Sequence, residues 1–167
     1  MTAAGPILQR QVREAMRSEV RVVAPDMPLP EVERRFIDAG VSGFPVVEHG
    51  KLVGVVTRSD IVRQLCVEQS LAEMVSDYYL DIDDFEQNSS ETLDDIGDRL
   101  GRRIERLHVA DVMRKTLLSV SPDDPLAAAV QVLLKHRVHR VLVTQAGRLV
   151  GIVTALDLVR FFAEQEL

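Results

Sequence analysis

The sequence has little of several residue types, and each shortage narrows what the protein can be. Among 167 residues it has one cysteine, Cys66, no tryptophan and only 4% aromatic residues. A single cysteine forms neither an internal disulfide nor a cysteine-based zinc cluster. No stretch approaches the roughly 18 consecutive apolar residues of a transmembrane helix, and the N-terminus lacks the basic start and apolar run of a signal peptide. We therefore expect a soluble, cytoplasmic protein with no membrane segment.

Positive charge is also scarce. The chain carries 20 Lys and Arg against 26 Asp and Glu, which gives a net charge of -6. Contacts to a nucleic-acid backbone need clustered Lys and Arg, so this balance argues against a DNA or RNA binder. A small phosphorylated ligand is compatible with it, since such a ligand needs only a few local donors.

The most informative feature that is present is a repeat. The stretch "KLVGVVTRSD" at 51–60 returns as "RLVGIVTALD" at 148–157. At an offset of 97 residues, 12–63 align with 109–160 without a gap, and 19 of the 52 pairs are identical. Two copies do not make a solenoid, which needs three or more units. We expect two similar modules packed against each other. The predicted boundaries are a tail at 1–11, a first motif at 12–65, an insertion at 66–108 and a second motif at 109–167.

Each copy predicts the same order of elements. A short helical turn (12–17; 109–114) precedes a short strand that ends at a proline (20–23; 117–120). An amphipathic helix follows, then two strands (43–48 and 52–57; 140–145 and 149–154) and a last helix from Arg58 or Ala155. The predicted fold class is α/β (α+β): two β-α-β-β-α motifs in a pseudo-two-fold arrangement, with a helical insertion between them.

Local signals support this order. Asp26 is a candidate acidic cap for the first amphipathic helix, with Pro28 in its first turn. Gly50 and Gly147 lie between the paired strands, where a tight hairpin needs positive φ. Apolar positions at helical spacing, expected to face the core, are Leu29, Val32, Phe36 and Ile37 in the first copy and Leu126, Val130, Leu133 and Leu134 in the second.

The insertion differs in composition from both copies. Residues 81–98 carry eight acidic side chains and no basic one. Apolar spacing predicts a helix on each side of a polar loop, through Leu71, Met74, Val75 and Tyr78 and through Leu93, Ile96, Leu100, Ile104 and Leu107. The acidic side chains form either a solvated face on two covering helices or a docking surface for a basic partner.

With this order of elements and the ending Gly-h-h-Thr-x-x-Asp (h, apolar) in both copies, the chain resembles a CBS-domain pair, or Bateman module. The resemblance covers 12–63 and 109–160 and includes "EAM" and "DVM" in the leading turns. The insertion is longer than the family's usual linker, and the chain looks like a stand-alone pair. The resemblance implies motifs packed sheet to sheet, clefts between the copies and, commonly, a homodimer.

The resemblance also implies a function. The clefts of the family commonly bind AMP, ADP, ATP, S-adenosylmethionine or, in some members, NAD, as ligands rather than required cofactors. Binding shifts a conformation that regulates a partner protein, as in energy sensing. The nucleotide-binding residues that it implies are Gly43, Phe44, Pro45, Thr57 and Asp60 in the first copy and Ser119, His139, Arg140, Val141, Thr154 and Asp157 in the second.

The Thr-x-x-Asp motif has two interpretations. It is a capping-box pattern, in which both side chains satisfy free N–H groups at a helix start, and such a cap contributes ~1 kcal/mol. Alternatively, the helix N-terminus favours a phosphate, and the carboxylate accepts hydrogen bonds from a ribose diol. The family resemblance assigns the second role to Thr57 and Asp60, and to Thr154 and Asp157.

The adenine slot is expected on the strand of the first copy that carries Gly43, Phe44 and Pro45. Pro45 has no N–H, so it fits best on an edge strand or at the first position of a strand. Adenine needs a flat apolar slot, and these residues supply apolar surface.

The second copy lacks this proline but has His139 and Arg140, which are either phosphate donors or residues of an exposed loop. A metal site at His136 and His139 is disfavoured, because no third ligand lies nearby in sequence. We expect the Asp157 site to prefer a phosphorylated nucleotide. We expect the Asp60 site to bind more weakly, or to take a less charged adenosine compound.

Enzyme motifs are absent. The chain has no Gly-x-Ser-x-Gly elbow, no Walker loop and no His-Glu-x-x-His, and Cys66 fits a small apolar helix residue. We therefore expect a non-catalytic regulatory module. One alternative is a structural docking module whose clefts stay empty and whose acidic insertion binds the partner. The other is an enzyme of unrecognised chemistry, whose turnover would depend on Asp60 or Asp157.

Overall fold

The computed structural model describes residues 7–67, 102 and 104–166, which form two compact units. The C-terminal unit contains 7–22, 47–54 and 115–166, and the central unit contains 23–46, 55–67 and the described residues up to 114. The helices predicted through the acidic insertion lie mostly outside the described residues.

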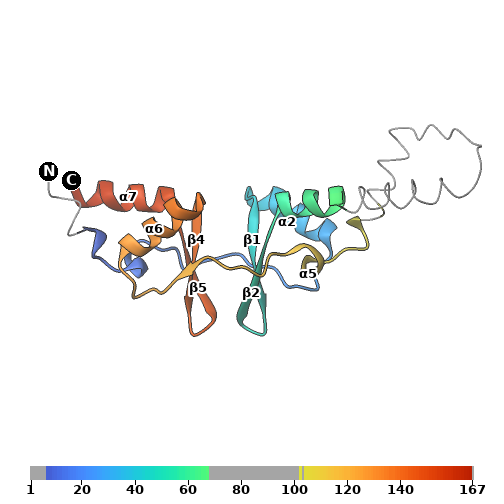
Figure 1. Ribbon diagram of the computed structural model, residues 1–167, viewed down its shortest axis with the longest axis horizontal. Coiled ribbons are helices and arrows are strands. Elements are labelled where there is room, and N and C mark those ends of the chain that lie inside the picture. The colour runs from blue at the N-terminus through green and yellow to red at the C-terminus, as the bar shows by residue number, and fades with distance from the viewer. Residues whose placement is uncertain (1–6, 68–101, 103, 167) are drawn as a thin grey trace, which may run out of the picture. The chain divides into compact units, whose positions relative to one another are not determined.

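The C-terminal unit is built on a three-stranded sheet. Its strands β3 (Ser119–Val120), β4 (Arg140–Gln145) and β5 (Arg148–Thr154) lie in this order, with β3 parallel and β5 antiparallel to β4. Helices α6 (Leu126–His136) and α7 (Ala155–Glu166) lie on one side of the sheet (Figure 1). The buried core between them contains Val12, Leu126, Val141, Val153 and Phe161.

The central unit repeats the plan with a smaller sheet. It contains helix α2 (Leu29–Ala39), the first part of β1 (Gly43–Glu48), the last part of β2 (Lys51–Thr57), a helical stretch at 58–67 and the short helix α5 (Val109–Val112). The hairpin tip at 47–54 belongs to the C-terminal unit. Phe36 of α2 stacks on Phe44 of β1, with ring centroids 5.1 Å apart. The predicted paired strands and final helices are therefore confirmed in both copies.

The two hairpin turns explain why each copy has a glycine between its strands. His49 and Gly50 join β1 to β2 with φ of 49° and 77°, and Ala146 and Gly147 join β4 to β5 with φ of 52° and 76°. Two successive positive φ values define the turn whose twist matches that of a hairpin. Glycine adopts this conformation without strain.

The predicted strand at 20–23 was wrong, because only Val23 pairs, in a single parallel bridge to Val46. Its counterpart in the second copy does form, as β3, where the N–H of Leu142 donates to the carbonyl of Leu118. Pro45 occupies the position equivalent to Leu142 and has no N–H to donate. Only the bond from the N–H of Val23 to the carbonyl of Pro45, at 3.0 Å, remains. Pro45 is the third residue of β1, and β1 is an edge strand of a two-stranded sheet, which is one of the two placements predicted for this proline.

Two predictions about the amphipathic helices also need correction. Pro28, not Asp26, is the N-cap of α2, and it caps through no side-chain hydrogen bond. Ile37 and Leu134 are 71% and 73% exposed, although both were expected to face the core. Each lies one residue beyond a buried position of its helix, so the buried stripe is narrower than apolar spacing indicates.

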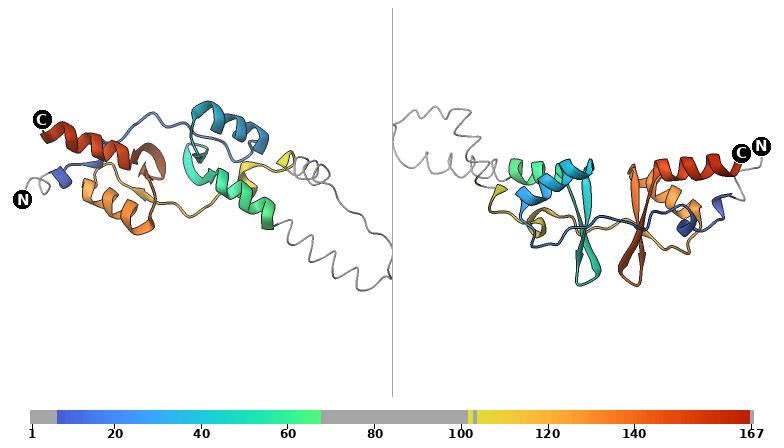
Figure 2. Two further views of the ribbon diagram at one scale, coloured as in Figure 1. Left: turned by 90° about the horizontal axis from the view of Figure 1, so that it is seen from above. Right: turned by 180° about the vertical axis from the view of Figure 1, so that it is seen from behind.

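The two copies exchange their leading segments. In the C-terminal unit, η1 (Val12–Glu14) of the first copy packs on the second, with the N–H of Val12 donating to the carbonyl of Asp124 at 2.9 Å. In the central unit, the N–H of Val109 in α5 donates to the carbonyl of Met27 at 3.0 Å. Figures 1 and 2 show the blue N-terminal turn beside α6 and α7, and the yellow α5 beside α2. The compact units are thus divided differently from the sequence repeats.

Candidate functional site

Each copy of Thr-x-x-Asp forms a capping box at a helix start. In the central unit, the Asp60 carboxylate accepts from the Thr57 N–H (3.1 Å) and hydroxyl (2.6 Å), and the Thr57 hydroxyl accepts from the Asp60 N–H. In the C-terminal unit, Asp157 and Thr154 form the same bonds at 2.9 and 2.6 Å. The capping interpretation is therefore confirmed at both positions.

Both carboxylates are buried and each is paired with arginine. Asp60 and Asp157 are 4% and 7% exposed, and they are the buried charged residues of the described part of the chain. Asp157 Oδ1 accepts from Nε and Nη2 of Arg17, at 2.7 and 2.5 Å. Asp60 Oδ1 accepts from Nε of Arg114 at 2.5 Å and from Nη1 of Arg63 at 3.3 Å.

Arg17 and Arg114 reach the carboxylates because of the segment exchange. Arg17 belongs to the first copy, yet it pairs through its backbone with Ile152, with N–H to carbonyl distances of 2.9 and 3.0 Å in the two directions. Arg114 of the second copy pairs in the same way with Val55, at 2.8 and 3.0 Å. Each copy therefore supplies the arginine that meets the aspartate of the other.

Sequence reasoning missed these arginines as partners of the aspartates. The available signal was that Arg17 and Arg114 are identical at equivalent positions of the repeat. Their contact with Asp157 and Asp60 spans 140 and 54 residues, so no local pattern indicates it.

The electrostatics of the Asp157 site favour the ionised carboxylate. Burial by itself acts to raise the pKa of Asp157, because it disfavours the charged form. Hydrogen bonds from Thr154 and Arg17, together with the charge of Arg17, outweigh burial and hold the pKa of Asp157 below its usual value.

This lowered pKa predicts an acid-sensitive contribution to stability. A carboxyl with a lower pKa in the folded state stabilises the fold above its unfolded pKa, about 3.9 for Asp. That contribution is lost as the pH falls through the folded pKa. We expect the free energy of unfolding to fall more steeply with acid, below about pH 5, in the wild type than in Asp157→Asn. Urea unfolding at a series of pH values tests this, and parallel curves for the two proteins would contradict it.

The predicted adenine-slot residues lie on β1 beside Thr57. A Cβ on Gly43 would lie 3.0 Å from Cγ2 of Thr57 and 3.2 Å from the carbonyl oxygen of Val56, so the absence of a side chain lets the strands approach closely here. Phe44 is 3% exposed and its ring belongs to the core with Phe36. Pro45 is also buried. The ring of Phe44, which was predicted to lie near the base, is therefore packed in the core of the unit.

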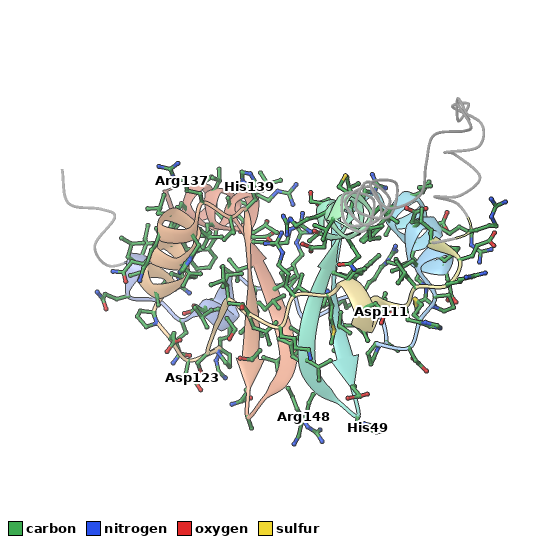
Figure 3. The ribbon with its side chains drawn as sticks, turned by 45° about the vertical axis from the view of Figure 1, so that its right-hand side comes forward. His49, Asp111, Asp123, Arg137, His139 and Arg148 are labelled. Carbon is green, nitrogen blue, oxygen red and sulfur yellow. The ribbon has the colours of Figure 1, made fainter. Side chains whose placement is uncertain are left out.

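The predicted residues of the second copy lie near the start of α7. Arg140 is opposite Thr154 in the β4–β5 register, and the carbonyl of His139 accepts from the N–H of Ala155 at 3.0 Å. Both side chains are exposed. Figure 3 shows His139 and Arg137 at this end of the hairpin and Arg148 at the opposite end.

The other two predicted residues of the second copy lie differently. Val141 is fully buried in the core, and Ser119 is exposed on β3, in register with Leu142. The structure therefore brings His139, Arg140, Thr154 and Asp157 to one end of the unit, whereas the side chain of Val141 faces away from solvent.

The described residues also bear on two other features, a metal centre and a membrane-spanning helix. No group of three or more His, Cys, Asp and Glu side chains there is arranged to hold a metal ion, so His136 and His139 gain no third ligand. None of the helices at 7–67 and 104–166 is long and apolar enough to cross a membrane.

Comparison with known families gives one match that covers both copies. Residues 12–66 and 109–164 match the CBS domain. An uncharacterized protein of Methanocaldococcus jannaschii is 28% identical over 150 residues, which span 89% of this chain and 88% of that protein. Four other curated relatives are longer, and the chain spans only 21% to 44% of their length.

Solved structures share the fold over nearly the whole chain. The CBS domain of a CBS domain-containing membrane protein from Sphaerobacter thermophilus has a TM-score of 0.68 and 27% identity, covering 95% of this chain and 91% of that one. The protein CBSX2, solved in complex with AMP, has a TM-score of 0.66 and 24% identity, covering 94% of this chain and 98% of that one.

Proposed function

The chain belongs to the CBS-domain family, and from this premise we propose that it is a cytoplasmic, non-catalytic regulatory module that binds an adenosine-containing ligand. The ligand is AMP, ADP or ATP, with S-adenosylmethionine and NAD as the other candidates. Its binding shifts a conformation that a partner protein reads. The similar structure of CBSX2 with AMP supports this choice of ligand class.

The observation that carries the proposal is the buried carboxylate at a helix start in each unit. Asp60 and Asp157 are held with their oxygens fixed by Thr57 and Thr154. A helix N-terminus favours a phosphate, and a carboxylate accepts hydrogen bonds from ribose hydroxyls. One short segment thus offers partners for both the sugar and the phosphate of a nucleotide.

The two sites are expected to differ in preference. His139 and Arg140 are exposed beside Thr154, and they add phosphate donors to the Asp157 site. The equivalent residues of the central unit are Ser42 and Gly43, which carry no charge. We therefore assign the phosphorylated nucleotide to the Asp157 site and a weaker or less charged adenosine ligand to the Asp60 site.

Calorimetric titration of nucleotide-stripped protein with AMP, ADP, ATP, S-adenosylmethionine and NAD tests the proposal. Micromolar binding, about -8 kcal/mol, is expected for at least one phosphorylated nucleotide. Asp157→Asn is expected to weaken it at least tenfold, and Asp60→Asn to weaken it less. Asp111→Asn is the matched control, because Asp111 also caps a helix start but is exposed. Binding that survives Asp157→Asn but is lost in Asp60→Asn would reverse the ranking.

A docking module with empty clefts is the second candidate. It is favoured by the observation that Asp60 and Asp157 are fully hydrogen-bonded without any ligand. In that case no ligand in the panel produces heat from folded protein, and the acidic insertion at 66–108 is the proposed partner surface. A pull-down with and without that segment then becomes the test.

We also propose a homodimer, as the family resemblance implies. Apolar side chains remain exposed at equivalent positions of both copies, Ile37 and Leu134 on the amphipathic helices and Val62 and Val159 on the final helices. Sedimentation equilibrium is expected to give twice the chain mass, and Val62→Glu combined with Val159→Glu is expected to give the monomer.

A further inference from the structure

The acceptor capacity of both site carboxylates is already used. A carboxylate has two oxygens with about four lone-pair sites in all. On Asp157, two are taken by Thr154 and two by Arg17. On Asp60, two are taken by Thr57, and Arg114 and Arg63 take one each. A ribose diol can bind either carboxylate only if a donor that is present now leaves.

The arginines are the donors that can leave. The threonine bonds are part of a capping box within three residues, and breaking them would also open a helix start. The side chains of Arg17 and Arg114 are 53% and 52% exposed, whereas those of Asp157 and Asp60 are 6% and 2% exposed. A half-exposed guanidinium that moves into water regains hydration. The backbone bridges of Arg17 to Ile152 and of Arg114 to Val55 do not involve the side chain.

We propose that Arg17 and Arg114 act as latches, which means that in the unliganded protein each occupies acceptor positions of one of the two carboxylates. A ligand binds when its ribose hydroxyls replace the arginine as hydrogen-bond donors. The inference rests on the proposed function for the identity of the ligand but not for the existence of the latch. Each latch lowers the apparent affinity, because only the open fraction of the protein is competent to bind. The freed guanidinium remains tethered at the site, where it is available to a phosphate or to solvent.

The two latches differ in strength. Asp60 is held by Arg114 and by Arg63 at 3.3 Å. Among the described residues, only Arg17 forms an ion pair with Asp157. The Asp157 site therefore opens first, which agrees with its assignment as the main nucleotide site.

The test compares Arg17→Met with Arg21→Met. Methionine keeps an unbranched apolar stem but has no N–H to donate. Arg21 is exposed on the same segment, so its replacement changes the net charge by the same amount without touching Asp157. Arg17→Lys, which keeps the charge but not the paired N–H groups, is the second variant in case Arg17→Met folds poorly. Two readouts are needed: labelling of Asp157 by a water-soluble carbodiimide and an amine, followed by mass spectrometry, and calorimetric titration with AMP.

We expect Asp157 to be labelled several-fold faster in Arg17→Met than in the wild type and in Arg21→Met. AMP is expected to bind about fivefold more tightly to Arg17→Met, equivalent to ~1 kcal/mol, with Arg17→Lys intermediate. Faster labelling without AMP binding to any of these proteins supports the latch and refutes AMP as the ligand. Unchanged labelling in both Arg17 variants overturns the latch. So does AMP binding that is equal or weaker when Arg17 is replaced, because the arginine would then not compete with the ligand.

Discussion

Gly151→Ala is expected to lower the free energy of unfolding by about 2–3 kcal/mol, the cost of forcing a methyl group into a packed site. An added Cβ would lie 2.7 Å from Sδ of Met16 and 2.9 Å from the carbonyl oxygen of Arg17. The methionine side chain can move, but the carbonyl oxygen is backbone that is paired with Ile152. The leading segment must therefore shift away from β5. Urea unfolding measures the loss.

The matched control for this prediction is Gly147→Ala. Gly147 has φ of 76° and nothing within 4 Å of an added Cβ. An alanine there is therefore strained by the positive φ but collides with no neighbouring atom. That strain is about 1–2 kcal/mol. If Gly147→Ala destabilises the protein as much as Gly151→Ala does, close packing of the exchanged segment is not what requires glycine at 151. Carbodiimide labelling of Asp157 should also rise in Gly151→Ala, because Arg17 moves with its backbone.

The elements of the fold that could be predicted are those with local signals. Hairpins follow from alternating apolar strands around Gly50 and Gly147, and α2 and α6 follow from helical spacing. The segment exchange could not be predicted, because Val12 meets Asp124 across more than 100 residues, and no repeat comparison shows which copy a turn packs on. The absence of a strand at 20–23 could have been predicted from the sequence. Pro45 removes an N–H from the position that pairs with this segment in the second copy.

The candidate site also has some features that could be predicted from local sequence and others that could not. The capping boxes were predictable because Thr57 and Asp60 are three residues apart. The role of Arg17 and Arg114 was not, since it depends on the exchange. The burial of Phe44 against Phe36 was also hidden, because a strand residue can face either side of its sheet until the register is known.

Asp60→Ala is expected to lower the free energy of unfolding by about 2–3 kcal/mol, from the lost cap and from donors left without their acceptor. The change removes Oδ2, which accepts from both the N–H and the hydroxyl of Thr57, and it leaves Arg114 and Arg63 without their shared oxygen Oδ1. Both arginines are at least half exposed and can turn to water, so the cost is below that of stranding a buried charge. Urea unfolding monitored by circular dichroism provides the measurement.

Asp111→Ala measures the free-energy cost of losing a helix cap that has no buried arginine network. Asp111 accepts from the N–H of His108 at 2.8 Å, as Asp60 does from Thr57, but its side chain is 48% exposed. Its replacement should cost only about 1 kcal/mol. Equal losses for the two variants would mean that Asp60 acts as an ordinary cap and that its arginine contacts add nothing to the fold. A larger loss for Asp60→Ala would mean that the carboxylate is held in place before any ligand arrives. A ligand at this site must then provide interactions that compensate for the arginine contacts it displaces.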